Sequence, residues 1–340
     1  MARFTVIITS FNRPNILKRN LEFLLSFKYK CKIIIADSSK NIFDNVSLKN
    51  LIIKNKILFK HFSKDTFFSK KVFEISKFID TKYCVLVPDD DFISLSAVKN
   101  CINFLDKNPT YSSCHGKYFS HVQKKLLGKK QIYFEDKTKN LISAEEDLYS
   151  RVKRYMAGEL LSQYTLYAVH KTLDFKSIWK ETALYANNWV IHEYFSTIMS
   201  LSKGKMKTLP IFYMSREPNY FVPINYMLRK KILTQKNNLK IAKVLSKKIN
   251  LKVKNKQRIE KEIFKFLETK RKNSKKKEQN TKYLNKSKNF LKVNYIFHIF
   301  EKFLFNNDEL LDSKCIDKIK NIIIKFEENI SEIENSRKMV

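Results

Sequence analysis

The sequence contains few of the residues that break regular structure: 4 Gly and 6 Pro among 340 residues. Collagen-like and linker-like chains need far more of both, so these classes are excluded. Five cysteines occur, an odd number, and no two are spaced as Cys-x-x-Cys. Four of them lie in or near apolar segments, where cysteine is usually a small buried hydrophobe. We therefore expect a reducing compartment and neither a disulfide framework nor a zinc site.

Long apolar runs are also missing. No run approaches the roughly 20 residues that a helix needs to span a bilayer. The opening "RFTVIITSF" is too short for the core of a signal peptide. These absences predict a cytoplasmic protein, either soluble or peripheral at the inner face of the membrane. The hydrophobic fraction of 44% still supplies a core and argues against wholesale disorder.

Acidic residues are scarce: 33 Asp and Glu face 67 Lys and Arg, for a net charge of +34. Residues 229–292 alone hold 24 basic and 4 acidic side chains. Such a block favours a polyanionic neighbour, which is a nucleic acid, an anionic membrane surface or an anionic glycan. No fingerprint of a nucleic-acid-binding module is present, so peripheral contact with an anionic membrane is the stronger expectation.

Short apolar strands alternate with amphipathic helices over the first third of the chain, which predicts an α/β domain with a mostly parallel sheet. The expected strands are 4–10, the segment "CKIIIADSS" ending near Asp37, a weaker one at 51–59, and 83–88. The expected helices begin at Pro14, Phe68 and Leu95.

The rest of the chain is harder to interpret. Residues 162–171 and 206–217 resemble strands, and 187–202 resemble a helix. Beyond 225 the apolar residues recur at helical spacing, with the clearest stripe at 316–333. A charged connection is expected near 269–282. We therefore predict two domains, a ligand-binding α/β domain over 1–220 and a basic helical region over 221–340.

Three predicted strands end in polar clusters: "TSFNR" (9–13), "DSSK" (37–40) and "DDD" (89–91). The carboxyl ends of parallel strands meet at one edge of a sheet, where ligands bind. Three adjacent carboxylates repel one another and need compensation. The triplet is either a solvated loop or a set of hard oxygen ligands for Mg²⁺ or Mn²⁺. A metal ion bound there would bridge to the phosphates of a substrate.

At this point a family resemblance is visible. "FTVIITSFNRPNILKRNLEFLLSF", "CKIIIADSS" and "YCVLVPDDDFISLSAVKNCINFL" resemble, in the expected order, the opening segments of inverting GT-A glycosyltransferases of the family 2 type. The segments "YAVH", "HEYF" and "SRE" are similar to those of a bacterial group found with surface-polysaccharide genes. The resemblance implies a Rossmann-like GT-A fold and a nucleotide-sugar donor that is UDP-linked, with CMP- and GDP-linked donors as alternatives.

The resemblance also assigns roles to the residues at the strand ends. It implies that the first cluster lines the nucleoside pocket through Thr9, Phe11, Asn12 and Arg13, and that Asp37 accepts a hydrogen bond from the base. Asp89 and Asp91 would be the outer carboxylates of the metal-binding D-x-D motif, with Asp91 the direct ligand, and Asp90 would face ribose or sugar hydroxyls. The family's paired acids after the second strand are here "DSS", and its later "ED" is absent.

Inverting transfer needs a general base that deprotonates the acceptor hydroxyl. Glu193 falls where the family's base-bearing helix would begin, and His192 is the alternative. The structural alternative is that Glu193 is only part of the polar face of a helix. His170 is a candidate for the acceptor site or a buried strand histidine, and Arg216 is a candidate clamp for the donor diphosphate or a surface arginine.

The predicted function is glycosyl transfer from a nucleotide sugar, with divalent metal, to a glycan, a lipid-linked glycan or a protein. One rival is a nucleotidyltransferase, which would favour a Gly-rich phosphate loop, and "TSFNRPN" contains no Gly. The other rival is a basic module that binds nucleic acid or an anionic glycan. Such a module does not need "PDDDF" at the end of a strand.

Overall fold

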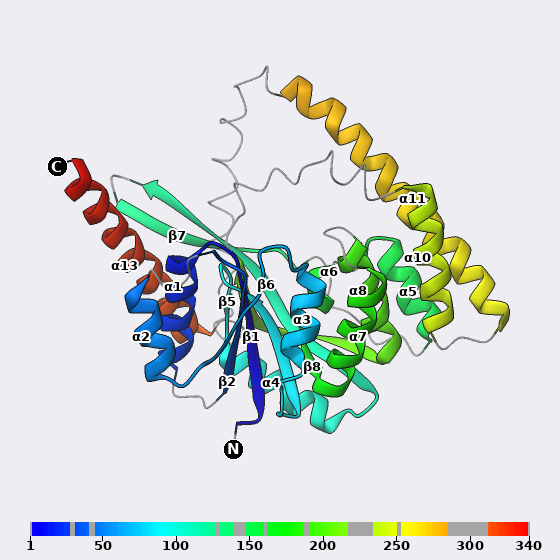
Figure 1. The fold of residues 1–340 in the computed structure, drawn as a ribbon, viewed down its shortest axis with the longest axis horizontal. Helices are drawn as coiled ribbons and strands as arrows, with labels where there is room; N and C mark the ends of the chain where they lie inside the picture. The colour runs from blue at the N-terminus through cyan, green and yellow to red at the C-terminus, as the bar shows by residue number, and fades with distance from the viewer. Residues whose placement is uncertain are drawn as a thin grey trace.

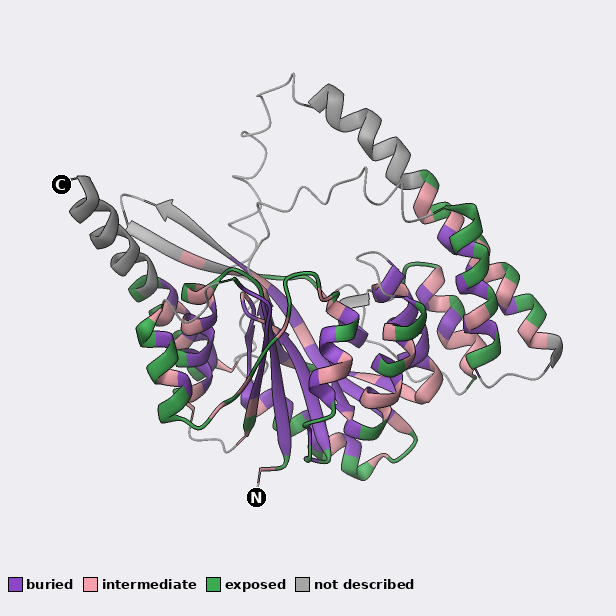
Figure 2. Ribbon diagram, in the orientation of Figure 1, coloured by how far each residue is buried: buried purple, intermediate pink, exposed green. Residues whose placement is uncertain are grey.

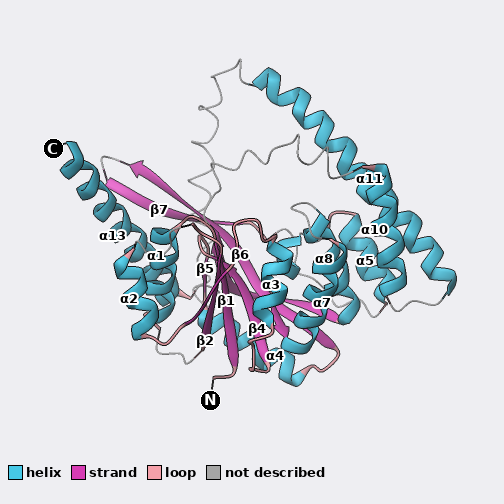
Figure 3. Ribbon diagram, viewed as in Figure 1, coloured by secondary structure: helices cyan, strands magenta, loops and turns pink. Residues whose placement is uncertain are grey.

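The structure is a computed structural model, and it describes ten stretches of the chain: 2–27, 31–40, 45–126, 129–138, 147–159, 162–186, 191–216, 234–249, 253–284 and 312–338. A single large sheet runs through the centre, with helices on both of its faces (Figures 1 and 3). The α/β class predicted from the sequence is confirmed.

Four parallel strands form the first half of the sheet, in the order β3-β2-β1-β4. Their bounds are β1 Phe4–Ser10, β2 Lys32–Asp37, β3 Leu58–His61 and β4 Tyr83–Pro88. The chain proceeds outward from β1 through β2 and β3, and then returns to the other side of β1 as β4. The strand order therefore reverses between β1 and β4, and the crevice at their carboxyl ends is where such sheets bind ligands.

The second half of the sheet is mixed. β8 (Val169–Lys171) is antiparallel to β4 and to β6 (Tyr111–Leu126), whereas β9 (Lys205–Arg216) is parallel to β6. β7 (Lys129–Asp136) forms a hairpin with β6. The two-residue β5 (Phe92–Ile93) pairs antiparallel with the end of β9. The segment directly after the acidic triplet is thereby attached to the last strand of the sheet.

The two central strands of the first half, β1 and β4, are apolar on both sides because helices cover both faces. On β1, Val6 and Ile8 pack toward α1 (Pro14–Leu25) and α2 (Val46–Lys54). Ile7, between them, packs toward α3 (Phe68–Ser76) and α7 (Thr172–Tyr185). Figure 2 shows β1 buried along its length between these layers, whereas the outer strand β3 is mostly exposed.

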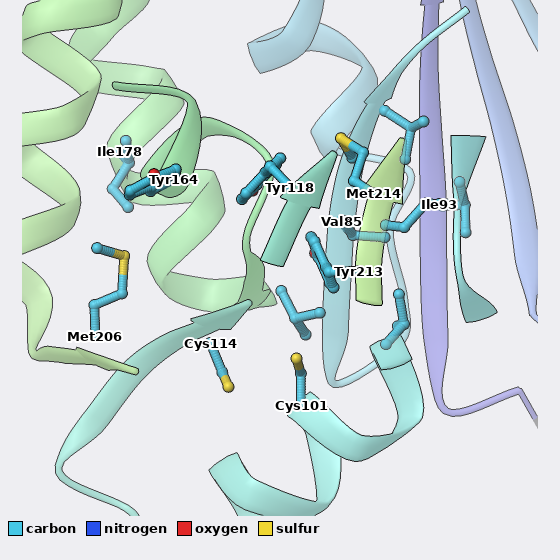
Figure 4. Close-up of a cluster of buried hydrophobic side chains, with 14 of the residues drawn as sticks. Val85, Ile93, Cys101, Cys114, Tyr118, Tyr164, Ile178, Met206, Tyr213 and Met214 are labelled. Atoms are coloured by element: carbon cyan, nitrogen blue, oxygen red, sulfur yellow. The ribbon is translucent and has the colours of Figure 1, made fainter. Parts of the chain in front are cut away.

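One continuous core extends from the first face under α4 (Leu95–Lys107) to the second half of the sheet. Figure 4 shows part of it, where Ile93 of β5 lies beside Met214 of β9, its partner in the sheet register. Cys101, Cys114 and Tyr213 are buried in the same cluster. The described cysteines are all free, as the sequence predicts.

The helical part beyond β9 divides into two groups. α10 (Gln235–Lys248) and α11 (Val253–Leu284) pack against each other beside α5 (Leu148–Met156) and α8 (Ile191–Lys203). α13 (Ser313–Lys338) lies at the other side of the molecule, against α1 (Figure 1). No helix within the described stretches has a segment long and apolar enough to cross a membrane.

Three sequence predictions need correction. Of the strand expected at 51–59, residues 51–54 belong to α2 and only residues 58–59 belong to a strand, β3. The strand expected at 162–171 is a short helix, α6 (Ser162–Leu166), followed by β8. The connection expected near 269–282 lies within α11.

The β6–β7 hairpin was not predicted, because its polar residues lack a clear alternation. Of the expected helix at 187–202, residues 187–190 lie outside the described stretches.

Candidate active site

The acidic triplet directly follows β4, at the point where the strand order reverses. A buried amide from α1 holds this turn: the Nδ2 atom of Asn20 donates to the backbone oxygens of Asp91 (2.6 Å), Asp89 (3.2 Å) and Pro88 (3.3 Å). Asn20 is only 1% exposed. The backbone conformation of the turn is therefore fixed from beneath by the first helix.

Asp89 is fully buried on the β1 side of this turn. Its carboxylate accepts a hydrogen bond from Ser10 Oγ (2.7 Å) and forms an ion pair with the Arg13 guanidinium. Burial raises the pKa of Asp89 to about 7, although the positive charge of Arg13 opposes the shift. Arg13 also donates through Nη1 to Asp90 Oδ2 at 2.7 Å. One guanidinium thus compensates two of the three adjacent carboxylates.

The turn after β1 is built around Asn12, which has a positive φ of 54°. Asparagine adopts this left-handed conformation more readily than most residues. The Asn12 N–H donates to Ser39 Oγ (2.6 Å), and its Oδ1 accepts from the Lys40 N–H (3.2 Å). These bonds join the ends of β1 and β2, so two of the three polar strand ends form one connected surface.

The end of β2 is held by its own acid. Asp37 is fully buried, and Ser39 donates to both of its oxygens, through Oγ (2.7 Å) and N–H (2.8 Å). The Lys71 ammonium on α3 lies below the same edge and donates to Ser10 O (3.0 Å) and Ser38 Oγ (3.1 Å). Burial lowers the pKa of Lys71, while the charges of Asp37 and Asp89 oppose that shift. Asp37 shapes this turn rather than projecting from it.

Asp91 lies on the opposite side of the turn, toward β9. Its Oδ2 accepts a hydrogen bond from Arg216 Nε at 2.9 Å, at the last residue of that strand. The Arg216 guanidinium lies 5.3 Å above the Tyr167 ring, a cation–π distance, and its side chain is 28% exposed. The ion pair with Asp91 raises the pKa of Arg216 further above its usual range, against the effect of burial. A second guanidinium therefore compensates the third carboxylate.

The phenol of Tyr167 lies beneath the Arg216 guanidinium, and the charge of Glu193 also affects its pKa. Burial raises the pKa of Tyr167, the charge of Arg216 opposes this, and the carboxylates of Asp91 and Glu193 raise it further. Both carboxylates therefore lie within electrostatic range of one phenol. Glu193 is half-buried in the first turn of α8, as the sequence predicts. The structure thus joins Asp91 and Arg216 in an ion pair, while Glu193 is related to them only through its charge effect on Tyr167.

The two candidate histidines lie elsewhere. His192 is buried, with its ring 5.1 Å from that of Phe68 on α3. His170 is paired with Cys84, near the start of β4 and far along the strand from Asp89. Its Nε2 lies 2.6 Å from Thr165 O, and burial lowers its pKa to about 4. His170 is thus a buried histidine of a strand, which is one of the two alternatives that the sequence leaves open, and its place in the acceptor site stays a prediction.

The remaining predicted residues lie at the expected edge. Thr9 is nearly buried at the end of β1, in register with Pro88 and Ala36. Phe11 is the first residue beyond β1 and is 49% exposed. An exposed aromatic ring beside a polar strand end offers a flat apolar surface to a ligand.

Sequence reasoning did not identify Asn20 and Lys71. Each is a polar residue beside the apolar stripe of an amphipathic helix: Asn20 lies between Leu17 and Leu21, and Lys71 precedes Val72. A polar side chain on the buried face of a helix needs a partner, and this was the available signal. The identity of the partner could not be derived from the sequence.

The carboxylates of the acidic turn are the candidate ligands for a divalent cation. No group of three or more His, Cys, Asp or Glu side chains converges within the described stretches. Mg²⁺ and Mn²⁺ sites often use one or two carboxylates and complete their coordination with water and substrate phosphates. Asp91, with Asp89 behind it on the same short turn, fits such a site. An all-protein metal cage is not formed by the described residues.

Comparison with known proteins supports the resemblance. Residues 5–159 match the family model described as Glycosyl transferase family 2. This segment is therefore similar to a family 2 glycosyltransferase domain, and the chain is a glycosyltransferase. The matched segment contains all three polar strand ends and the acidic triplet, so the resemblance seen in the sequence is confirmed. A search among curated proteins found no match.

The fold of this glycosyltransferase is similar to that of S. aureus TarS. The crystal structure of TarS 1–349 aligns with 15% identity over 78% of this chain and 71% of TarS, with a TM-score of 0.51. The TarS 1–349 complex with UDP-GlcNAc aligns with 16% identity over 78% and 72%, also with a TM-score of 0.51. At this identity the likeness establishes the fold, which is GT-A with a helical C-terminal region.

Proposed function

We propose that this glycosyltransferase transfers a sugar from a UDP-linked donor, with inversion and a divalent cation, to a glycan or lipid-linked acceptor. The observation that supports this most is the arrangement beyond β4. There Asp91 and Arg216 form an ion pair, and Glu193 lies within electrostatic range of the same Tyr167. The TarS complexes with UDP and UDP-GlcNAc support the choice of a UDP-linked donor. The proposed catalytic domain spans 1–220, and 221–340 is the helical region.

The nucleoside pocket is assigned to the joined ends of β1 and β2. Phe11 offers its exposed ring to the base, and the Asn12 turn shapes the floor. Thr9 and Arg13 line the same edge, although Arg13 is already engaged by Asp89 and Asp90. Asp37 contributes indirectly, because Ser39 occupies both of its carboxylate oxygens.

The divalent cation is assigned to Asp91, supported by Asp89, with Mn²⁺ or Mg²⁺ as the candidates. When bound, the cation neutralises the negative charge of the departing nucleotide phosphates. Arg216 is already aimed at Asp91, and a guanidinium suits phosphate oxygens. Asp91 would hold the cation, and Arg216 would then turn its guanidinium toward the donor diphosphate. Asp90 remains the candidate for sugar hydroxyls because its side chain is 13% exposed.

Glu193 is the proposed general base. It must accept the proton of the acceptor hydroxyl as that oxygen attacks the anomeric carbon from the face opposite the departing nucleotide. Its half-buried position in the first turn of α8 fixes the side chain near Tyr167. His192 is the weaker candidate, since its ring is buried against Phe68.

The basic region supports a location at an anionic surface. α10 presents the exposed side chains of Lys236, Lys240, Lys243 and Lys247. Each lysine near an anionic leaflet contributes roughly 1 kcal/mol of attraction. We propose a cytoplasmic enzyme that contacts the inner face of the membrane, where a lipid-linked acceptor is located. Vesicle flotation at low and high salt tests this, and failure to bind anionic vesicles at low salt would refute it.

The test of activity is release of free nucleotide from a panel of UDP-, GDP- and CMP-linked sugars, with and without Mn²⁺. We expect Mn²⁺-dependent release from a UDP-linked sugar. The Asp91→Ala variant should lose this activity. The matched control is Asp80→Asn, an exposed acid that precedes β4 at the opposite edge of the sheet.

The panel also separates the alternatives. Absence of turnover with every donor would overturn the proposal of a nucleotide-sugar substrate. Activity that does not depend on Mn²⁺ would favour a CMP-linked donor and a mechanism in which Arg216 neutralises the phosphate alone. Full activity of Asp91→Ala would show that the acidic turn does not hold the cation.

A further inference from the structure

The helix that follows the long basic region makes contact close behind the acidic turn. Asp312 precedes α13, and its Oδ1 accepts from the Cys315 N–H (3.0 Å), which caps the helix. Its Oδ2 accepts from Ser94 Oγ (2.8 Å) and also from Ser96 Oγ. One carboxylate therefore joins the start of α13 to the start of α4.

Ser94 forms hydrogen bonds to three elements behind the acidic turn: α4, β9 and Asp312 before α13. It is fully buried three residues beyond Asp91, and its Oγ caps α4 by accepting from the Ala97 N–H (3.2 Å). Its own N–H donates to Tyr213 O on β9 (2.8 Å). The position of Ser94 thus sets the distance between the acidic turn and the strand that carries Arg216. Asp312 is the charged group that holds the Ser94 hydroxyl.

α13 has a second point of attachment on α1. Lys318 Nζ donates to Ser26 O (2.6 Å) and lies 4.0 Å from the centre of the Phe27 ring. Phe27 contacts Phe23, with ring centres 5.1 Å apart, and Phe23 contacts Phe92 at 4.9 Å. Phe92 is the residue directly after Asp91. α13 therefore supports the segment after the acidic turn both through Asp312 and through this row of aromatic rings.

The apolar face of α13 is buried, which fixes the helix in place. Cys315 and Ile319 are fully buried, and Ile316 and Ile323 are nearly so. A charged carboxylate at the amino ends of two helices is also favoured by both helix dipoles. The hydrogen bonds of Asp312 therefore belong to a packed interface rather than to an incidental contact at the surface.

We propose that Asp312 is a positioning residue for glycosyl transfer: through Ser94 it holds Asp91 at the distance from Arg216 that donor binding requires. The proposal rests on the proposed function only in assigning donor binding to Asp91. Asp312 touches no substrate and acts through the β5 segment. α13 would then be a necessary part of the catalytic unit, although it follows the basic region in the sequence.

The experiment uses the full chain with Asp312→Ala, Asp312→Asn and the control Asp317→Ala, an exposed acid on the same helix. Amide hydrogen exchange is measured for residues 89–96, and the KM for the donor and kcat are measured below the unfolding temperature. We expect Asp312→Ala to speed exchange and raise the donor KM, each on the order of tenfold, since hydrogen bonds to a charged group are lost. Asp312→Asn should be intermediate, and Asp317→Ala should match the parent chain.

The outcomes separate this proposal from the proposed function. Faster exchange and a raised KM in Asp312→Ala alone would support positioning. A lowered unfolding temperature with unchanged exchange at 89–96 and an unchanged KM would overturn it, because Asp312 would then only stabilise α13. If no donor is turned over by the parent chain, the proposed function fails, and hydrogen exchange alone decides whether Asp312 holds the acidic turn.

Discussion

The two sides of the acidic turn are built differently. On the β1 side, Asp89 is fully buried, and Ser10 and Arg13 engage its carboxylate. On the β9 side, Asp91 is equally buried, and its partner Arg216 lies against the ring of Tyr167. The carboxylate on the β1 side is held by two residues from the end of β1, whereas the pair on the β9 side lies beside an aromatic ring. We expect the first side to act as a structural anchor and the second to exchange partners on donor binding. The difference indicates that adjacent acids of one motif contribute separately to stability and to chemistry.

The largest expected effect is on the β9 side. Asp91→Asn should lower kcat by about 10³-fold, because it removes the charge that would hold the cation against the donor phosphates. Because Asp91 is buried and paired with Arg216, the unfolding temperature should also fall, but by less than in Asp89→Asn. Initial rates at saturating donor and Mn²⁺ measure the first quantity, and circular dichroism measures the second. A large loss of stability would contradict the division between the two sides.

The next effect concerns the base assigned to the same side. Glu193→Gln should lower kcat by about 10²-fold with little change in donor KM, since the amide cannot accept the acceptor's proton. His192→Gln is the companion variant, and its pH–rate profile should match that of the parent chain. Near-normal turnover in Glu193→Gln would remove this residue from the mechanism.

The β1 side should respond in stability. Asp89→Asn should lower the free energy of unfolding by about 2–3 kcal/mol, because the amide nitrogen that replaces one carboxylate oxygen cannot accept a hydrogen bond from Ser10 or Arg13. Asp90→Asn, which loses one partly exposed contact with Arg13, should lower it by less than about 1 kcal/mol. Urea titrations measure both. Equal losses in the two variants would show that Asp89 is not the anchor.

A smaller effect than that of Asp89→Asn is expected at the residue that joins the two sides. Asn20→Ala should lower the free energy of unfolding by about 1–2 kcal/mol, because three backbone oxygens lose one shared donor. The exposed Asn15 on the same helix provides the control as Asn15→Ala. A difference between the two variants of only a few tenths of a kcal/mol would mean that water replaces the amide.

The sequence was sufficient where the pattern was local. The apolar runs ending at Ser10, Asp37 and Pro88 predicted three strands of the sheet, because buried parallel strands are continuous and apolar. The sequence was not sufficient where a strand pairs with a segment distant in the chain or where one segment contains both helix and strand. The segment 51–59 has helical and extended halves, and β8 is too short to show a period.

The candidate site was predictable in outline, since the topology brings polar strand ends together. The partners of those residues were not. Nothing local marks Arg216 as the partner of Asp91, since 125 residues separate them. The two alternatives for His170 stayed open for the same reason, because a histidine in a short strand gives no sign of which end of the sheet it occupies. The partner of Asp91 and the position of His170 depend on burial and strand register, which residue type alone does not reveal.

The contact between Ser94 and Asp312 spans 218 positions of the chain. During synthesis the acidic turn, its arginines and the whole sheet emerge from the ribosome before Asp312 is added. Contacts this distant in sequence also form late in folding, because closing a long loop is slow. If Asp312 positions the turn, the enzyme gains full donor affinity only after Asp312 and α13 have been synthesised. Partial chains would then hold a folded sheet but sequester little nucleotide sugar.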